Sequence, residues 1–162
     1  MNQLLVKSVG SNQVLKRAIV GDVGYDLEVC IQGEDGVSIP SHGFIDVPVG
    51  LAVKIPENAW GMITGRSSTF ARRRLLVMQG IIDSGYTGAL FIFIYNFGEE
   101  AAEVHNGERL AQLILVPKFE SKIQYVEELP NTMRGENGFG SSGGFKGNGG
   151  NGNGYKLECL DF

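Results

Sequence analysis

The fold of this chain is indicated by residues 80–88, Gly80-Ile81-Ile82-Asp83-Ser84-Gly85-Tyr86-Thr87-Gly88, and by the apolar run that follows them, Ala89-Leu90-Phe91-Ile92-Phe93-Ile94-Tyr95. β-Branched and aromatic side chains stand on both sides of a short segment that is rich in glycine. This pattern is typical of two β-strands joined by a tight turn, so we predict a β-hairpin.

The chain up to about Leu129 repeats this pattern of short apolar runs broken by Gly, Pro, Asn and Asp, with little helical periodicity. We therefore predict an all-β domain built as a sandwich, a jelly roll or a small barrel. One short helix is expected at 67–74, where Ser67 or Ser68 would cap its start. The other predicted strands are Tyr25–Ile31, Phe44–Ile55, Gly61–Ile63, Leu75–Met78, Ala101–Val104, Arg109–Pro117 and Ile123–Val126.

The composition changes after Pro130, where ten glycines alternate with Asn, Ser and Lys between positions 135 and 154. Such a segment has too little apolar surface to offset the entropy of ordering the chain. We expect a β body at 1–130, a mobile arm at 131–143 that a ligand would order, and a Gly/Asn-rich linker with a terminal extension at 144–162.

Length, charge and cysteine content restrict the class of protein. The 162 residues, 43% of them hydrophobic, suffice for one core. A net charge of -4 gives no overall attraction to nucleic acid, so a bound phosphate must be held by local donors. Cys30 and Cys159 lack the spacing of a metal site or a disulfide scaffold. No signal peptide or membrane span is apparent, so we expect a cytoplasmic protein that binds neither nucleic acid nor membranes.

Asp83 and Tyr86 are the first candidates for chemistry, because they lie three residues apart in the predicted hairpin. The backbone groups of such a hairpin are able to pair with a planar base while the tyrosine packs on a sugar. The alternative is an ordinary turn in which Asp83 caps a backbone group and Tyr86 fills the core.

A second candidate is Gly65-Arg66-Ser67-Ser68, which places a guanidinium and two hydroxyls at the start of the predicted helix. This combination binds phosphate through N–H groups and a bidentate arginine. The alternative is a helix cap beside a surface arginine. The following Arg72, Arg73 and Arg74 are more typical of a solvated or interface surface, and we leave them out of the site.

A third candidate is Arg134-Gly135-Glu136-Asn137-Gly138-Phe139-Gly140-Ser141-Ser142-Gly143. It combines Arg and Ser donors with the exposed N–H groups of glycines and one ring that would stack on a base. It is not a Walker A loop, because the Gly-Lys-Ser/Thr ending is missing. The alternative is a glycine-rich tail without function. The presence of Arg134 and Phe139 among the glycines is less expected for such a tail.

Together these segments resemble the five motifs of the trimeric dUTPase (deoxyuridine 5′-triphosphate nucleotidohydrolase) family, in the family's order. Motif one is Val23-Gly24-Tyr25-Asp26-Leu27, with Val23 where the family usually has Ala. Motif two is 65–68, with Gly65 where the family usually has Pro, and motif three is 80–88. Motif four is Gly107-Glu108-Arg109-Leu110-Ala111-Gln112-Leu113, and motif five is 134–143. Five motifs in the right order are hard to explain by chance.

The resemblance implies a jelly-roll-like dUTPase fold (a β-clip), a homotrimer with shared active sites, and Mg²⁺-dependent hydrolysis of dUTP to dUMP and pyrophosphate. It makes Asp83 the residue that activates water for attack on the α-phosphorus, Tyr86 the side chain on the deoxyribose, and Phe139 the ring on uracil. Mg²⁺ is expected on triphosphate and water oxygens, with Asp26 either in contact with it through water or purely structural. The other residues expected to bind substrate are Arg66, Ser67, Ser68, Gly80, Ile82, Gln112, Arg134, Gly140, Ser141 and Ser142.

Two alternative functions stay open. A dCTP deaminase shares the fold and similar Arg-Ser-Ser and Ile-Asp-x-Gly patterns, but it needs a catalytic Glu ten residues beyond the Asp, where this chain has Phe93. A dUTPase-fold protein with a regulatory protein partner is the other alternative, with residues 155–162 as a docking peptide.

Overall fold

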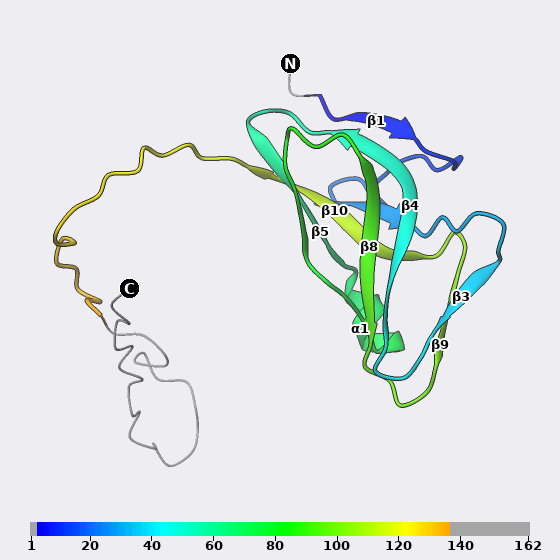
Figure 1. The fold of residues 1–162 in the computed structure, drawn as a ribbon. Helices are drawn as coiled ribbons and strands as arrows, with labels where there is room; N and C mark the ends of the chain where they lie inside the picture. Colours follow the sequence, from blue (N-terminus) through cyan, green and yellow to red (C-terminus); the bar gives the residue numbers. More distant parts are fainter. Residues whose placement is uncertain (1–2, 137–162) are drawn as a thin grey trace, which may run out of the picture. The chain divides into compact units, whose positions relative to one another are not determined.

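The computed structural model of the protein describes residues 3–136 (Figure 1). The fifth-motif residues Phe139, Gly140, Ser141 and Ser142, together with Cys159 and the rest of 144–162, lie outside the described residues. The chain divides into a compact unit that ends at Ser121 and a second unit that begins at Lys122.

Ten strands and one helix, all in the first unit, make up the regular structure. The first antiparallel sheet has the order β1 (Leu5–Ser8), β4 (Phe44–Lys54), β8 (Ala89–Asn96) and β6 (Leu75–Val77). The second has the order β2 (Gly24–Glu28), β10 (Arg109–Pro117), β5 (Ala59–Gly65) and β7 (Gly80–Ile82), and β3 (Gly36–Ile39) pairs with β9 (Ala102–His105). The helix α1 spans Ser67–Arg73. This is the predicted all-β, jelly-roll-like fold with one short helix.

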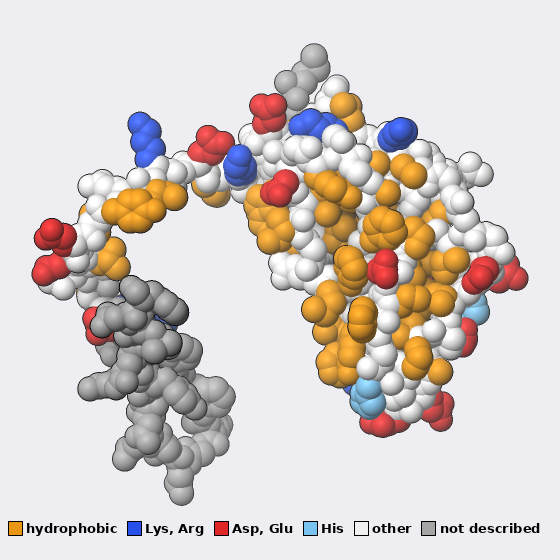
Figure 2. Space-filling model, in the orientation of Figure 1, with side chains coloured by type: hydrophobic (Ala, Val, Ile, Leu, Met, Phe, Trp, Pro, Cys, Tyr) orange, Lys and Arg blue, Asp and Glu red, His pale blue; other side chains and the backbone are white. Residues whose placement is uncertain are grey.

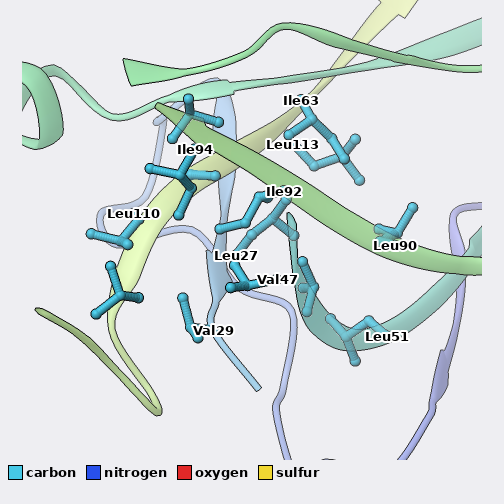
Figure 3. Close-up of a cluster of buried hydrophobic side chains, with 14 of the residues drawn as sticks. Leu27, Val29, Val47, Leu51, Ile63, Leu90, Ile92, Ile94, Leu110 and Leu113 are labelled. Atoms are coloured by element: carbon cyan, nitrogen blue, oxygen red, sulfur yellow. The ribbon is translucent and has the colours of Figure 1, made fainter. Parts of the chain in front are cut away.

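The core lies between the inward faces of these sheets (Figure 3). Along β8 the side chains alternate, with Leu90, Ile92 and Ile94 fully buried and Phe91 and Phe93 exposed. Residues such as Leu27, Leu113 and Ile63 supply the facing side chains from the second sheet. Because burying one such side chain contributes about 1.5–3 kcal/mol, this alternation determines which face of β8 points inward.

The outward face of the first sheet is unusually apolar. Phe44 on β4, Phe91 and Phe93 on β8, Leu76 on β6 and Met78 just beyond it are all exposed. Figure 2 shows apolar side chains gathered over the face that β4 and β8 form. An exposed apolar surface of this kind marks an interaction site.

The predicted hairpin at 80–95 is wrong, because its two strands belong to different sheets. β7 pairs with β5, where Ile82 lies opposite Gly61, whereas β8 pairs with β4 and β6. Residues 83–88 therefore form a crossover between the two sheets. Local sequence shows that a turn joins two strands, but the neighbour of each strand is chosen by the core.

Two further predictions need correction. The strand predicted at Ile123–Val126 does not form: residues 122–136 contain neither helix nor strand, since no second strand of the described chain pairs with this stretch. The N-cap of α1 is Arg66, and neither Ser67 nor Ser68 takes that place. The backbone of Arg66 is extended, with φ -78° and ψ 151°, and both serines are already helical. No helix of the described residues is long and apolar enough to cross a membrane.

Candidate active site

A bulge at Leu110 ties helix α1 to the second sheet. The register of β10 against β2 shifts between Arg109 and Ala111, which leaves the carbonyl of Leu110 free for other partners. That carbonyl oxygen accepts the backbone N–H of Arg66 at 3.2 Å and the hydroxyl of the buried Thr69 at 2.8 Å. The bulge therefore fixes the first residue of α1 and the position of the Arg66 backbone.

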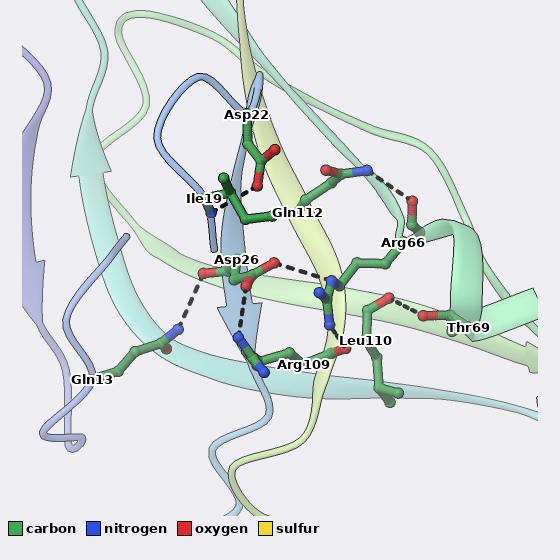
Figure 4. Close-up of polar contacts among 10 residues, drawn as sticks. Gln13, Ile19, Asp22, Asp26, Arg66, Thr69, Arg109, Leu110 and Gln112 are labelled. Carbon is green, nitrogen blue, oxygen red and sulfur yellow. Dashed lines mark hydrogen bonds and ion pairs between the residues drawn. The ribbon is translucent and has the colours of Figure 1, made fainter. Parts of the chain in front are cut away.

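Asp26, on β2, binds two arginines from different elements (Figure 4). Its Oδ1 lies 3.0 Å from Nε of Arg66, and its Oδ2 lies 3.1 Å from Nη1 of Arg109. Arg66 also donates from Nη1 to the carbonyl of Arg109 at 3.2 Å. Only 8% of the carboxylate side chain is exposed, against 28% and 43% for the two arginines. Since each guanidinium has five N–H donors, both keep donors for a ligand.

Gln112, on β10, joins motif four to motifs one and two. Its side-chain amide donates to the carbonyl of Gly65, the residue before Arg66, at 3.2 Å. A Cβ atom on Gly24 would lie 2.1 Å from Oε1 of Gln112, so any larger residue at that position of motif one would displace the Gln112 side chain. The three motifs therefore form one continuous wall, and Figure 4 shows the contacts of Asp26, Arg66 and Gln112 within it.

A hollow of about 360 Å³ opens beside this wall and is basic. Its lining includes four arginines and one acid, Glu108. Arg73 donates to both carboxylate oxygens of Glu108, at 2.7 and 2.6 Å. This ion pair gives Arg73 a structural role. The excess of cations suits an anionic ligand. The lining residues are Arg66, Ser68, Thr69, Arg72, Arg73, Gly107, Glu108, Arg109 and Leu110; Ser67 is exposed and does not line it.

The crossover that carries Asp83 and Tyr86 is held by three hydrogen bonds. The N–H of Tyr86 donates to the carbonyl of Asp83 at 3.0 Å, which closes the turn. The hydroxyl of Tyr86 donates to the carbonyl of Ala89 at 2.8 Å, and Nζ of Lys54 donates to the carbonyl of Ser84 at 2.7 Å. Both Asp83 and Tyr86 are exposed, so their side chains are available to a ligand.

A second hollow, of about 260 Å³, lies at this crossover and is mostly apolar. Asp83 is the single carboxylate of its lining, and Tyr86 contributes an aromatic ring. Such a hollow suits a planar base or a sugar with one reactive group placed beside it. It is lined by Ile81, Ile82, Asp83, Tyr86, Ala89, Leu90, Phe91 and Phe93; Gly80 pairs with Ile63 and is not among these residues.

The two hollows share no lining residue and lie at opposite ends of β5. Asp83 follows Ile82, which is opposite Gly61, whereas Arg66 follows Gly65. The six residue steps from Trp60 to Arg66 span roughly 20 Å at about 3.3 Å each. A single chain therefore does not bring Asp83 and Arg66 together.

The surroundings of Asp26 bear on the expected metal contact. Among residues 3–136 there is no group of three or more His, Cys, Asp or Glu side chains that would hold a metal ion. Both oxygens of Asp26 already accept from guanidinium groups. These donors do not fit direct coordination of a cation by Asp26.

A comparison with known protein families identifies the family of the chain. The family model described as dUTPase matches residues 11–143. The chain belongs to the dUTPase family. Among dUTPases, it is 37% identical over 144 residues to the deoxyuridine 5′-triphosphate nucleotidohydrolase of Paramecium bursaria Chlorella virus 1, covering 88% of this chain and 99% of that relative. It is 35% identical over 129 residues to the enzyme of the same name from Citrobacter koseri, covering 78% of this chain and 84% of that relative.

Solved dUTPase structures from phages have the same fold. A mutant dUTPase of phage 80α superposes with a TM-score of 0.79 at 30% identity, covering 87% of this chain and 99% of that one. A second 80α dUTPase structure, with dUpNHpp, gives a TM-score of 0.73 at 27% identity, covering 81% and 100%. A mutant dUTPase of Staphylococcus aureus phage phi11, with a structural Mg(II) ion, gives 0.71 at 25%, covering 80% and 100%.

Arg109 and Lys54 contact the candidate site, and the sequence did not single them out. Arg109 stands within motif four, but its ion pair with Asp26 joins residues 83 positions apart. Lys54 lies outside all five dUTPase motifs. Neither contact has a local sequence signal, because each depends on strand pairing.

Proposed function

We propose that this chain is a dUTP diphosphatase, which hydrolyses dUTP to dUMP and pyrophosphate. The observation that carries the proposal is the placement of Asp83 and Tyr86 on one apolar hollow of about 260 Å³ in a dUTPase fold. Relatives of this chain are named deoxyuridine 5′-triphosphate nucleotidohydrolase, and several phage dUTPase structures include dUpNHpp.

In this proposal Asp83 accepts a proton from the water that attacks the α-phosphorus. The ring of Tyr86 packs on the deoxyribose, where a ribose 2′-hydroxyl would clash, and the backbone of Gly80 and Ile82 reads the uracil edge. Because a carboxylate is a weak base, positioning and charge stabilisation supply much of the rate acceleration. The arm residues Arg134, Phe139, Ser141 and Ser142, with the backbone of Gly140, close over the base and the γ-phosphate.

The phosphates are assigned to the wall of Arg66, Ser67, Ser68 and Gln112. The separation of roughly 20 Å between Asp83 and Arg66 of one chain exceeds the reach of an arginine side chain. We therefore assign Asp83 and Arg66 of one site to two different copies of the chain. A homotrimer supplies that arrangement, and the apolar face of β4, β6 and β8 gives it a surface to bury.

Mg²⁺ dependence is part of the proposal, with the cation bound mainly by the triphosphate and by water, as its preference for octahedral oxygen ligands favours. When bound, it would neutralise phosphate charge during the displacement. Asp26 holds Arg66 and Arg109 in position for the phosphates, and any contact with the cation would pass through water.

The alternatives are weaker. The position where a deaminase needs its Glu is Phe93, which lines the hollow of Asp83 and cannot move protons. A regulatory protein partner stays a proposal, favoured by phage dUTPases that are described as controlling transfer of virulence genes. Cytoplasmic localisation also stays a proposal, which the spacing of the two cysteines favours.

The test is to incubate the protein with each deoxynucleoside triphosphate and with UTP, with Mg²⁺ or with EDTA, and to identify products by chromatography. We expect dUMP and pyrophosphate from dUTP alone, and only with Mg²⁺. Comparable turnover of dCTP or UTP would indicate a looser nucleotide hydrolase, and conversion of dCTP to dUTP would indicate a deaminase.

A further inference from the structure

Lys54, the last residue of β4, reaches across to the crossover that carries Asp83 and Tyr86. Its Nζ atom donates to the carbonyl oxygen of Ser84 at 2.7 Å, in a partly buried position. Ser84 directly follows Asp83 in the chain. The contact joins residues 30 positions apart and links the crossover to the end of β4, an inner strand of the first sheet.

This arrangement is unusual for a lysine. A surface lysine normally extends its ammonium group into water and keeps its rotamer freedom, and fixing it costs side-chain entropy. No carboxylate of residues 3–136 forms an ion pair with Lys54. The ammonium group is thus committed to a backbone carbonyl, where it makes a charge-assisted hydrogen bond.

The bond from Lys54 restrains a part of the crossover that the other two bonds do not reach. The N–H of Tyr86 donates to the carbonyl of Asp83 and closes the turn, and the hydroxyl of Tyr86 donates to the carbonyl of Ala89, the first residue of β8. Neither bond involves Ser84, the residue next to Asp83. The bond from Lys54 fastens the Ser84 carbonyl to a second strand of the first sheet, β4.

We propose that Lys54 is a positioning residue for Asp83 and Tyr86. By holding the Ser84 carbonyl, the ammonium group keeps the Asp83 carboxylate at the place from which it activates water. Misplacing a catalytic group by about 1 Å can cost roughly a hundredfold in rate. The inference rests on the proposed dUTP hydrolysis and predicts an effect on turnover rather than on substrate binding.

The test compares Lys54→Met, which keeps the apolar stem and loses the donor, with Lys54→Arg, which restores a charged donor. Lys7→Met, at an exposed position of β1, is the matched control. We measure kcat and KM for dUTP, and the Kd of dUpNHpp, in which an imido group replaces a bridging phosphate oxygen. Lys54→Met should lower kcat tenfold or more, while the Kd of dUpNHpp changes by about twofold at most. Lys54→Arg should recover most of kcat. Lys7→Met should match the wild type in kcat, KM and Kd.

A normal kcat in Lys54→Met would overturn the inference, and so would an equal loss of kcat and of dUpNHpp affinity. If Lys54→Met fails to fold by circular dichroism, Lys54→Gln replaces it, and the inference then requires a lower kcat in Lys54→Gln than in Lys54→Arg. Failure of the proposed function itself is distinct, because the wild type would then leave dUTP intact.

Discussion

Mixing two inactive variants should restore activity if each site is shared between copies. Asp83→Asn removes the proposed base, and Arg66→Ala removes the proposed phosphate donor, so each variant alone should lose turnover by orders of magnitude. The roughly 20 Å between these residues along β5 implies that a site takes Asp83 from one copy and Arg66 from another. In randomly mixed trimers, a given site has an intact Asp83 with probability one half and an intact Arg66 with probability one half. About one quarter of the sites should then be complete.

The assay is to co-express the two variants with different affinity tags in equal amounts, purify the mixture, and compare its dUTP hydrolysis with that of the wild type. We expect about one quarter of wild-type kcat per chain, with KM unchanged. The control pairs Asp83→Asn with a chain that carries both substitutions, and it should show no recovery. If the first mixture is as inactive as its parents while light scattering shows mixed trimers, the shared-site reasoning is refuted.

Three other outcomes are expected. Gly88→Ala would place Cβ 2.5 Å from the hydroxyl oxygen of Tyr86, so the tyrosine ring must move away. The ratio of kcat/KM for dUTP to kcat/KM for UTP should then fall about tenfold. An unchanged ratio would show that Tyr86 does not recognise the sugar. Asp26→Asn should lower the free energy of unfolding by about 1–2 kcal/mol, less than for a fully buried pair because its two guanidinium partners are partly exposed. Urea denaturation measures this loss, with Asp22→Asn at an exposed position as the control. Truncation before Arg134 should leave the β body folded, since no described strand is removed, and should abolish dUTP hydrolysis. Full dUTP hydrolysis by the truncated protein would show that the arm is not needed for catalysis.

Much of the fold was predictable because its signals are local. The strand at Arg109–Pro117 was predicted with its observed bounds, and the helix at 67–74 was found at Ser67–Arg73. β8 was predicted to within one residue, since its apolar run ends where Asn96 enters the core and binds backbone carbonyls. β1 was missed because its sequence, Leu-Val-Lys-Ser, does not alternate apolar and polar residues, in keeping with the exposure of all four residues.

By itself, the sequence determined an all-β domain with one short helix, and the order of the five dUTPase motifs. Both depend on residue types at short spacings. Tertiary structure alone decided that β7 and β8 join different sheets, that Ile123–Val126 is not a strand in the single chain, and that Asp26 binds two arginines. It also placed Asp83 and Arg66 at opposite ends of β5 and Lys54 against the crossover. The reason is physical: a strand can satisfy its backbone hydrogen bonds with any of several partners, and the choice among them comes from burying side chains that are far apart in the chain.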